Sequence, residues 1–175
     1  MINFLKESLW KQFGASIDML KKAIILWPEE YWNSVKRFYY ISYHTIIFLD
    51  YYLTIPPTNF SSPLPFTITE RANVPEDAVD DVMPSRVYSK KELLEYLIAC
   101  RTKCHILIEG LTEEKFKQQW IDEPDELAGP DTIRYSVLEI LFYNMRHVQH
   151  HTAQLNILLR EKINITPDWV SDAED

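Results

Sequence analysis

Residues 34–54 have the sequence SVKRFYYISYHTIIFLDYYLT, which is apolar almost all round when it is wound as a helix. A helix that is hydrophobic on every side is stable in water only when other elements cover it. Its expected N-terminal cap is Asn33 or Ser34, whose side chains can accept a hydrogen bond from the first turn. The segment therefore predicts a central, buried helix, with His44 in its middle among aromatic and aliphatic neighbours.

Three other segments place apolar residues at helical spacing, namely residues 2–26, 89–109 and 131–163. The segment 89–109 opens with SKKE, a capping box in which the Ser89 hydroxyl and the Glu92 carboxylate satisfy free backbone amides. The last segment is expected to begin at Asp131 or Thr132, after Pro130. Four long helices with no strand signal between them predict an all-α fold, a four-helix bundle.

The connections between these helices differ in length. Residues 27–33 form a short turn, which predicts that the first two helices are antiparallel neighbours. Residues 55–88 hold six of the ten prolines, and proline interrupts long regular elements because it lacks an amide donor. The length of this segment permits, without requiring, a crossover that makes helices two and three parallel, and an up-down-down-up order is our prediction. No repeat or second domain is visible, so residues 1–175 are interpreted as one domain.

Composition and charge exclude several classes of partner. The formal net charge is -8 and no Lys/Arg-rich block is present, so we expect no nucleic-acid partner. No stretch reaches the roughly 18 uncharged apolar residues of a membrane span, so we expect no membrane partner. Residues 1–27 mix charged with apolar side chains, unlike a signal peptide, and a cytoplasmic location is the expectation. The three glycines form no glycine-rich phosphate loop.

Residues 144–156, NMRHVQHHTAQLN, hold three of the five histidines. On a helix, His147 and His151 differ by about 40° around the axis and by roughly 6 Å along it, so both imidazoles can reach one metal ion. His150 is about 60° from His147 and about 100° from His151, so its side chain diverges from the pair. A solvated polar helix face is the alternative interpretation of the same pattern.

A third imidazole can come from His44 if the second and fourth helices are neighbours, whereas a hydrogen-bonded core histidine is the alternative. Three neutral imidazoles with open coordination positions suit Zn, Ni, Fe or Mn and leave room for water or substrate. No histidine has Glu three residues before it, so the di-iron bundle pattern is missing. Cys100 and Cys104 with His105 form either a metal-binding pattern or, for the cysteines, two small core residues on one apolar stripe.

The segment YHTIIFLDYYL, followed far downstream by HVQHHTAQLN, resembles the DinB-like (YfiT-like) metal-binding family. The family motif is histidine, two residues, two histidines, two residues and glutamine, and it falls on His147, His150, His151 and Gln154. The family's helix-two histidine falls on His44. This resemblance covers most of the chain. It implies an up-down-down-up four-helix bundle in which His44, His147 and His151 hold one divalent ion.

The resemblance also implies a class of reaction. Family members with determined roles are similar to thiol-dependent transferases or isomerases, so we expect a metal-dependent transferase that uses a low-molecular-weight thiol and a small-molecule substrate. The alternatives are a metal-dependent hydrolase and a non-enzymatic, metal-stabilised binding or dimerisation module. The family's usual Arg-Gly before the glutamine is Thr152-Ala153 here, which keeps the ligands but changes a substrate contact.

Two further expectations concern the surroundings of the site. No carboxylate is placed to act as a base, because Asp50 lies more than one turn beyond His44 and is rotated away from it. The chain is rich in aromatic residues that one small core does not fully absorb, so we expect a homodimer that pairs through helix faces.

Overall fold

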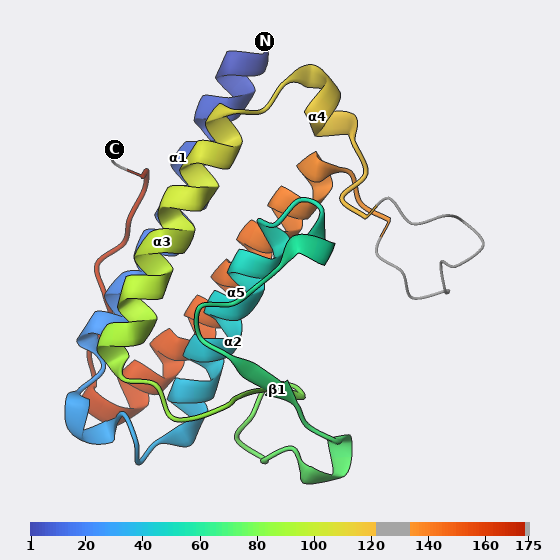
Figure 1. Cartoon of the computed structure of the whole chain (residues 1–175). Helices are drawn as coiled ribbons and strands as arrows, with labels where there is room; N and C mark the ends of the chain where they lie inside the picture. Colours follow the sequence, from blue (N-terminus) through green and yellow to red (C-terminus); the bar gives the residue numbers. More distant parts are fainter. Residues whose placement is uncertain (122–133, 174–175) are drawn as a thin grey trace.

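The computed structural model describes residues 1–121 and 134–173, most of which are helical (Figure 1). The α-helices are α1 (Ile2–Leu26), α2 (Lys36–Tyr52), α3 (Lys90–Glu109), α4 (Glu113–Lys117) and α5 (Val137–Ile163). Short 3-10 turns occupy Glu29–Tyr31, Pro57–Asn59 and Arg71–Asn73, and a two-stranded antiparallel sheet pairs β1 (Phe66–Ile68) with β2 (Val82–Pro84). The all-α class is therefore confirmed, while α4 and the small sheet were not predicted.

Two helix starts differ from the prediction. Asp131 and Thr132 lie outside the described residues, and α5 begins only at Val137, where the Ser136 side chain accepts from the backbone N–H of Glu139 in a reciprocal capping box. The caps predicted for α2 are also wrong, because this helix starts at Lys36 without any side-chain cap. The capping box at Ser89 is confirmed.

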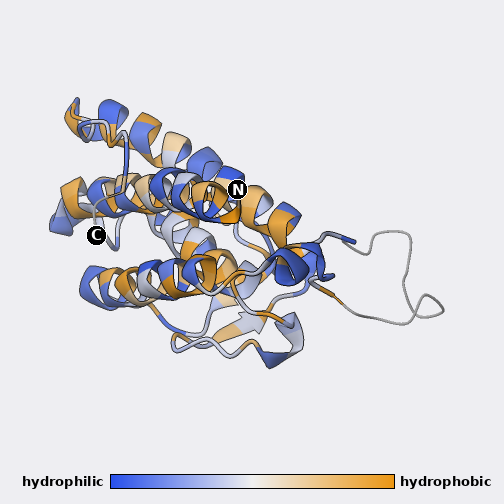
Figure 2. Cartoon of the chain, turned by 90° about the horizontal axis from the view of Figure 1, so that it is seen from above, coloured by the Kyte–Doolittle hydropathy of each residue, from blue (hydrophilic) through white to orange (hydrophobic). Residues whose placement is uncertain are grey.

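The long helices pack in a closed ring in which α2 and α1 each contact both α3 and α5. Seen from above, each helix alternates between hydrophobic and hydrophilic segments (Figure 2). In α2, 12 of the 17 residues are buried: Phe38, Tyr39, Ile41, Ser42, Tyr43, His44, Thr45, Ile46, Ile47, Leu49, Asp50 and Tyr52. The prediction of a central helix that is covered on every side is confirmed. No helix among the described residues combines the length and the hydrophobicity that a membrane crossing requires.

A buried polar cluster joins the later part of α2 to α3. The Asp50 carboxylate accepts hydrogen bonds from the Tyr96 hydroxyl at 2.6 Å and from the Lys103 ammonium at 2.5 Å. Lys103 also donates to the Thr54 hydroxyl at 2.7 Å. A buried carboxylate is tolerated only when such partners replace its lost hydration. Asp50, to which the sequence pattern gave no role, therefore ties two helices together away from the histidines.

The Pro-rich crossover lies against α2 and carries the β1–β2 hairpin (Figure 1). The buried Tyr43 hydroxyl donates to the carbonyl oxygens of Leu64 at 3.0 Å and Pro65 at 3.1 Å. Near the start of α3, the backbone N–H of Tyr88 donates to the Tyr39 hydroxyl at 3.1 Å. Since both tyrosines belong to α2, these hydrogen bonds fix the path of the crossover along that helix.

The chain after α5 turns back onto α1. Asn164 ends the helix in the left-handed conformation with φ 55°, which turns the chain out of the helix. The backbone N–H of Ala173 then donates to the Lys11 carbonyl at 2.9 Å. Its methyl group lies so near Gly14 that a Cβ there would be only 2.5 Å from it. The absence of a side chain at Gly14 thus permits close packing of the tail on α1.

Candidate metal centre

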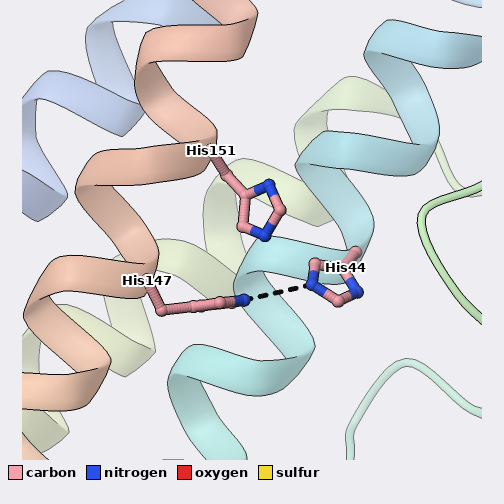
Figure 3. Close-up of side chains that lie close together, drawn as sticks. All are labelled: His44, His147 and His151. Atoms are coloured by element: carbon pink, nitrogen blue, oxygen red, sulfur yellow. Dashed lines mark hydrogen bonds between the residues drawn. The ribbon is translucent and has the colours of Figure 1, made fainter.

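Three histidines from two helices converge in the interior of the bundle (Figure 3). His44 projects from α2, whereas His147 and His151 project from adjacent turns of α5. One ring nitrogen of each lies within 4.8 Å of those of the other two, and the Nε2 atoms of His44 and His147 are 3.0 Å apart. His147 and His151 lie together as their spacing predicted, and His44 joins them as the family resemblance implied, so this triad could hold a metal ion.

The register between α2 and α5 brings the triad together. Asn144, one turn before His147, is fully buried and donates its side-chain amide to the Leu49 carbonyl of α2 at 3.0 Å. Aromatic rings then enclose the imidazoles, with Phe48 at 4.6 Å from the His44 ring and Tyr52 at 5.8 Å from the His147 ring, centroid to centroid. Water therefore has little access to the rings in this part of the bundle.

Burial favours the neutral form of the two imidazoles on α5. Desolvation, with smaller contributions from His151, His44 and His150, lowers the pKa of His147 from its ordinary 6.5 to about 3. Desolvation also lowers the pKa of His151 to about 4, against the opposing effect of its hydrogen bond to Gln154. Only the neutral form of imidazole has a lone pair for a metal ion. Both residues are therefore ready to act as ligands near neutral pH.

The second ring nitrogens have three different environments. His151 Nδ1 lies 2.8 Å from Gln154 Oε1, an acceptor, which leaves Nε2 of His151 without a proton. His44 Nδ1 lies 3.0 Å from Asp80 Oδ2. His147 Nδ1 is buried and has no hydrogen-bond partner among residues 1–121 and 134–173. In His44 and His151, these contacts leave Nε2 as the nitrogen available to a metal ion.

The donor set fits a divalent ion. Two imidazole nitrogens that bind one zinc ion tetrahedrally at about 2.0–2.1 Å lie about 3.3 Å apart, close to the 3.0 Å between Nε2 of His44 and Nε2 of His147. Without an ion, those facing nitrogens can share only a single hydrogen bond, because a neutral imidazole has one N–H. Among residues 1–121 and 134–173, no other group of three potential ligands is this close together.

The remaining histidines and cysteines lie outside this cluster. His150 is exposed, as its place on the helix predicted. Its Nε2 lies 3.3 Å from the amide nitrogen of Gln154. His105 stacks on Trp10 with ring centroids 4.1 Å apart. Cys100 and Cys104 are free and buried, and burial raises the pKa of both thiols. Among the described residues, these cysteines and His105 do not form a close group of three potential ligands, whereas the interpretation of the cysteines as core residues is confirmed.

The structure also brings in a carboxylate that the sequence pattern did not single out. Asp80 lies in the crossover, one of several acidic residues in the segment PEDAVDD, residues 75–81. Nothing in that segment distinguishes Asp80 from Asp77 or Asp81. Only the path of the crossover along α2 places the Asp80 side chain, rather than its neighbours, against His44.

Comparison of the chain with family models, curated proteins and solved structures finds no match.

We predict that acid weakens the fold through the triad. Between pH 6.5 and about 4, the unfolded chain binds protons at His147 and His151 that the folded chain does not bind. The free energy of unfolding therefore falls as the pH is lowered through this window. Urea unfolding at several pH values, in metal-free buffer with a chelator, measures the effect.

A double variant, His147→Gln with His151→Gln, should show a shallower dependence on pH. His150→Gln is the matched control, because this exposed residue on the same helix should leave the wild-type slope unchanged. An equal slope in the double variant and the wild type would contradict the assignment.

Proposed function

We propose that this protein is a single-domain, divalent-metal-binding protein of the DinB-like kind. His44, His147 and His151 hold one Zn, Ni, Fe or Mn ion in this proposal. The observation that carries it is the convergence of three imidazole side chains from two helices, with ring nitrogens within 4.8 Å of one another. Uncharged nitrogen ligands and a largely buried setting are the features that such ions use in proteins.

The proposal includes the up-down-down-up order of the long helices. Two sets of contacts support it. Tyr39, early in α2, contacts Tyr88 just before α3, whereas Asp50, late in α2, contacts Lys103 late in α3. Contacts in this order favour parallel packing of α2 and α3, which the crossover between them makes possible.

The reaction that we propose is transfer of a low-molecular-weight thiol to a small electrophilic substrate. A divalent ion at the triad supplies Lewis acidity, which lowers the pKa of a thiol or water molecule at an open coordination position. The three ligands bring no negative charge, and the Asp80 carboxylate beside His44 offsets only part of the charge of a divalent ion, so the site favours an anionic sulfur. The rings of Phe48 and Tyr52 limit water near the reacting sulfur. The proposal includes a cytoplasmic location, because low-molecular-weight thiols stay reduced there.

Hydrolysis is less well supported by the surroundings of the triad. A hydrolase needs a base or an orienting group for water. Among the described residues, the carboxylate beside the triad is Asp80, and both of its oxygens are engaged, one with the Val82 backbone N–H and the other with His44. A thiol ionises far more readily than water and does not require that base.

A non-enzymatic, metal-stabilised module is the second candidate. The observation that favours it is burial, since His44 and His151 are only 8% and 6% exposed. A cavity of about 730 Å³ lies between α1, α5 and the C-terminal tail, and none of the three histidines lines it. A closed coordination sphere with no room for substrate would suit such a module.

We also propose that the chain forms a homodimer through the outer face of α5. Phe142 and Trp169 beside the large cavity are 45% and 73% exposed. Glu139 and Arg146 lie at equal distances along α5 from the midpoint between Phe142 and Tyr143. Two antiparallel copies of α5 that cross there bring each Glu139 opposite the Arg146 of the other copy, which is the reciprocity of a two-fold interface.

Metal content tests the triad directly. His44→Ala, His147→Ala and His151→Ala should each abolish stoichiometric metal, measured by elemental analysis, whereas His150→Ala should retain it. Excess metal should raise the melting temperature of the parent and of His150→Ala but not of the three ligand variants, because a ligand that binds the folded state stabilises it. A metal-free His150→Ala beside a loaded His151→Ala would refute the choice of ligands.

Thiol transfer tests the enzymatic proposal. Metal-loaded protein is incubated with glutathione or cysteine and an epoxide, so that a sulfur–carbon bond forms, a carbon–oxygen bond breaks and the oxygen takes a proton from solvent. We expect loss of thiol above the uncatalysed rate, and a decrease of at least about tenfold after chelation or in His147→Ala. Full metal occupancy without turnover across a panel of thiols and electrophiles would instead support the non-enzymatic module.

Sedimentation tests the dimer. The wild type should sediment at twice the 20.8 kDa of one chain at micromolar concentration, and Arg146→Glu should sediment as a monomer because it faces Glu139 across the interface. The control is Lys91→Glu, the same charge change at an exposed position of α3, which should remain dimeric. A monomeric wild type would reject the proposal.

A further inference from the structure

Asp80 is a carboxylate that the crossover presents to the candidate metal centre. It precedes β2, and its Oδ1 accepts a hydrogen bond from the backbone N–H of Val82 at 3.0 Å. Its Oδ2 lies 3.0 Å from Nδ1 of His44. The side chains of His44 and Asp80 are 11% and 28% exposed. The carboxylate is thus anchored through one oxygen and directed at the imidazole through the other.

The contact determines which nitrogen of His44 carries the proton. Neutral imidazole has a single N–H, and an ionised carboxylate only accepts. The approach of Oδ2 to Nδ1 is short but bent away from the angle of a good hydrogen bond, so it acts mainly as attraction between the negative charge and the N–H dipole. That attraction favours a proton on Nδ1. Nε2 of His44, which lies 3.0 Å from Nε2 of His147, then keeps its lone pair.

The other two histidines have no comparable partner. Nδ1 of His151 meets the neutral Gln154, which lies on the same helix, and Nδ1 of His147 is buried without a partner. Among the described residues, Asp80 is therefore the charged group that contacts an Nδ1 atom of the triad. It also comes from a different segment of the chain, which Tyr43 holds against α2 through hydrogen bonds to the Leu64 and Pro65 carbonyls.

We propose that Asp80 is the positioning residue of this centre: it holds His44 as the Nδ1–H tautomer, with Nε2 directed at His147 and His151. A carboxylate behind a ligating histidine orients the ring and strengthens it as a ligand. It also places one negative charge beside a ligand set that has none. The part of this inference that concerns metal affinity rests on the proposed function, whereas the part that concerns the tautomer does not.

The first experiment uses nitrogen NMR of the metal-free protein with labelled imidazoles at neutral pH. In the wild type, the His44 signals should show a protonated Nδ1 and an unprotonated Nε2. In Asp80→Ala, which removes the acceptor, and in Asp80→Asn, which removes only the charge, Nδ1 should lose protonation in favour of Nε2. Asp80→Asn keeps an oxygen for the Val82 N–H and so protects the hairpin. Asp81→Asn, the same change at the exposed neighbouring residue, is the control and should leave the signals unchanged.

The second experiment measures Zn²⁺ affinity by competition with a chelating dye. Asp80→Asn should weaken binding about tenfold to a hundredfold, the range found for lost partners of ligating residues, and Asp81→Asn should not. If the wild type binds no Zn²⁺ but its tautomer depends on Asp80, the proposed function fails and the positioning role stands. If Zn²⁺ binds and both Asp80 variants keep the wild-type tautomer and affinity, the positioning role is overturned while the proposed function stands.

Discussion

The burial of α2 on every side is the constraint on which the rest of the structure depends. Because this helix has apolar residues around its whole circumference, α3, α5 and the crossover must all cover it. Apolar packing has no strong directional preference. A polar contact therefore fixes the position of each of the three elements that cover α2. Asp50 binds Lys103 on α3, Asn144 on α5 binds the Leu49 carbonyl, and Tyr43 binds the crossover.

The chemistry of the candidate site follows from the same burial. Histidines one turn apart on an exposed helix would titrate near 6.5 and carry charge over much of the acidic range. On the face of α5 that covers α2, His147 and His151 lose water instead, and their pKa values fall to about 3 and about 4. Meeting His44 there turns a common surface pattern into a cluster of three nitrogen donors. An ion bound at the facing Nε2 atoms would give each of these nitrogens a partner.

The crossover has two physical roles in this arrangement. It covers one side of α2 with apolar and aromatic residues, and it brings the Asp80 carboxylate to a histidine of that same helix. Within the described part of the chain, the surroundings of the site are thus unequal, with a carboxylate behind His44, an amide behind His151 and no partner behind His147. A site where the carboxylate beside His44 is already engaged is better suited to a nucleophile that ionises readily, such as a thiol, than to water. This physical asymmetry is what separates our proposed transferase from the hydrolase.

The sequence by itself determined the helical class and most of the helix limits, because apolar spacing and the Ser89 capping box are local properties of the chain. It also determined that His147 and His151 share a face while His150 leaves it, since helix geometry requires this. The start predicted for α5, directly after Pro130, was wrong. The helix begins after Ser136, which forms a second capping box with Glu139. Tertiary structure alone decided that His44 meets the pair, that Asp80 rather than Asp77 or Asp81 reaches His44, and that Asp50 faces α3 instead. These contacts join residues far apart in the chain, and they depend on helix register and on the path of a Pro-rich segment that no local periodicity specifies.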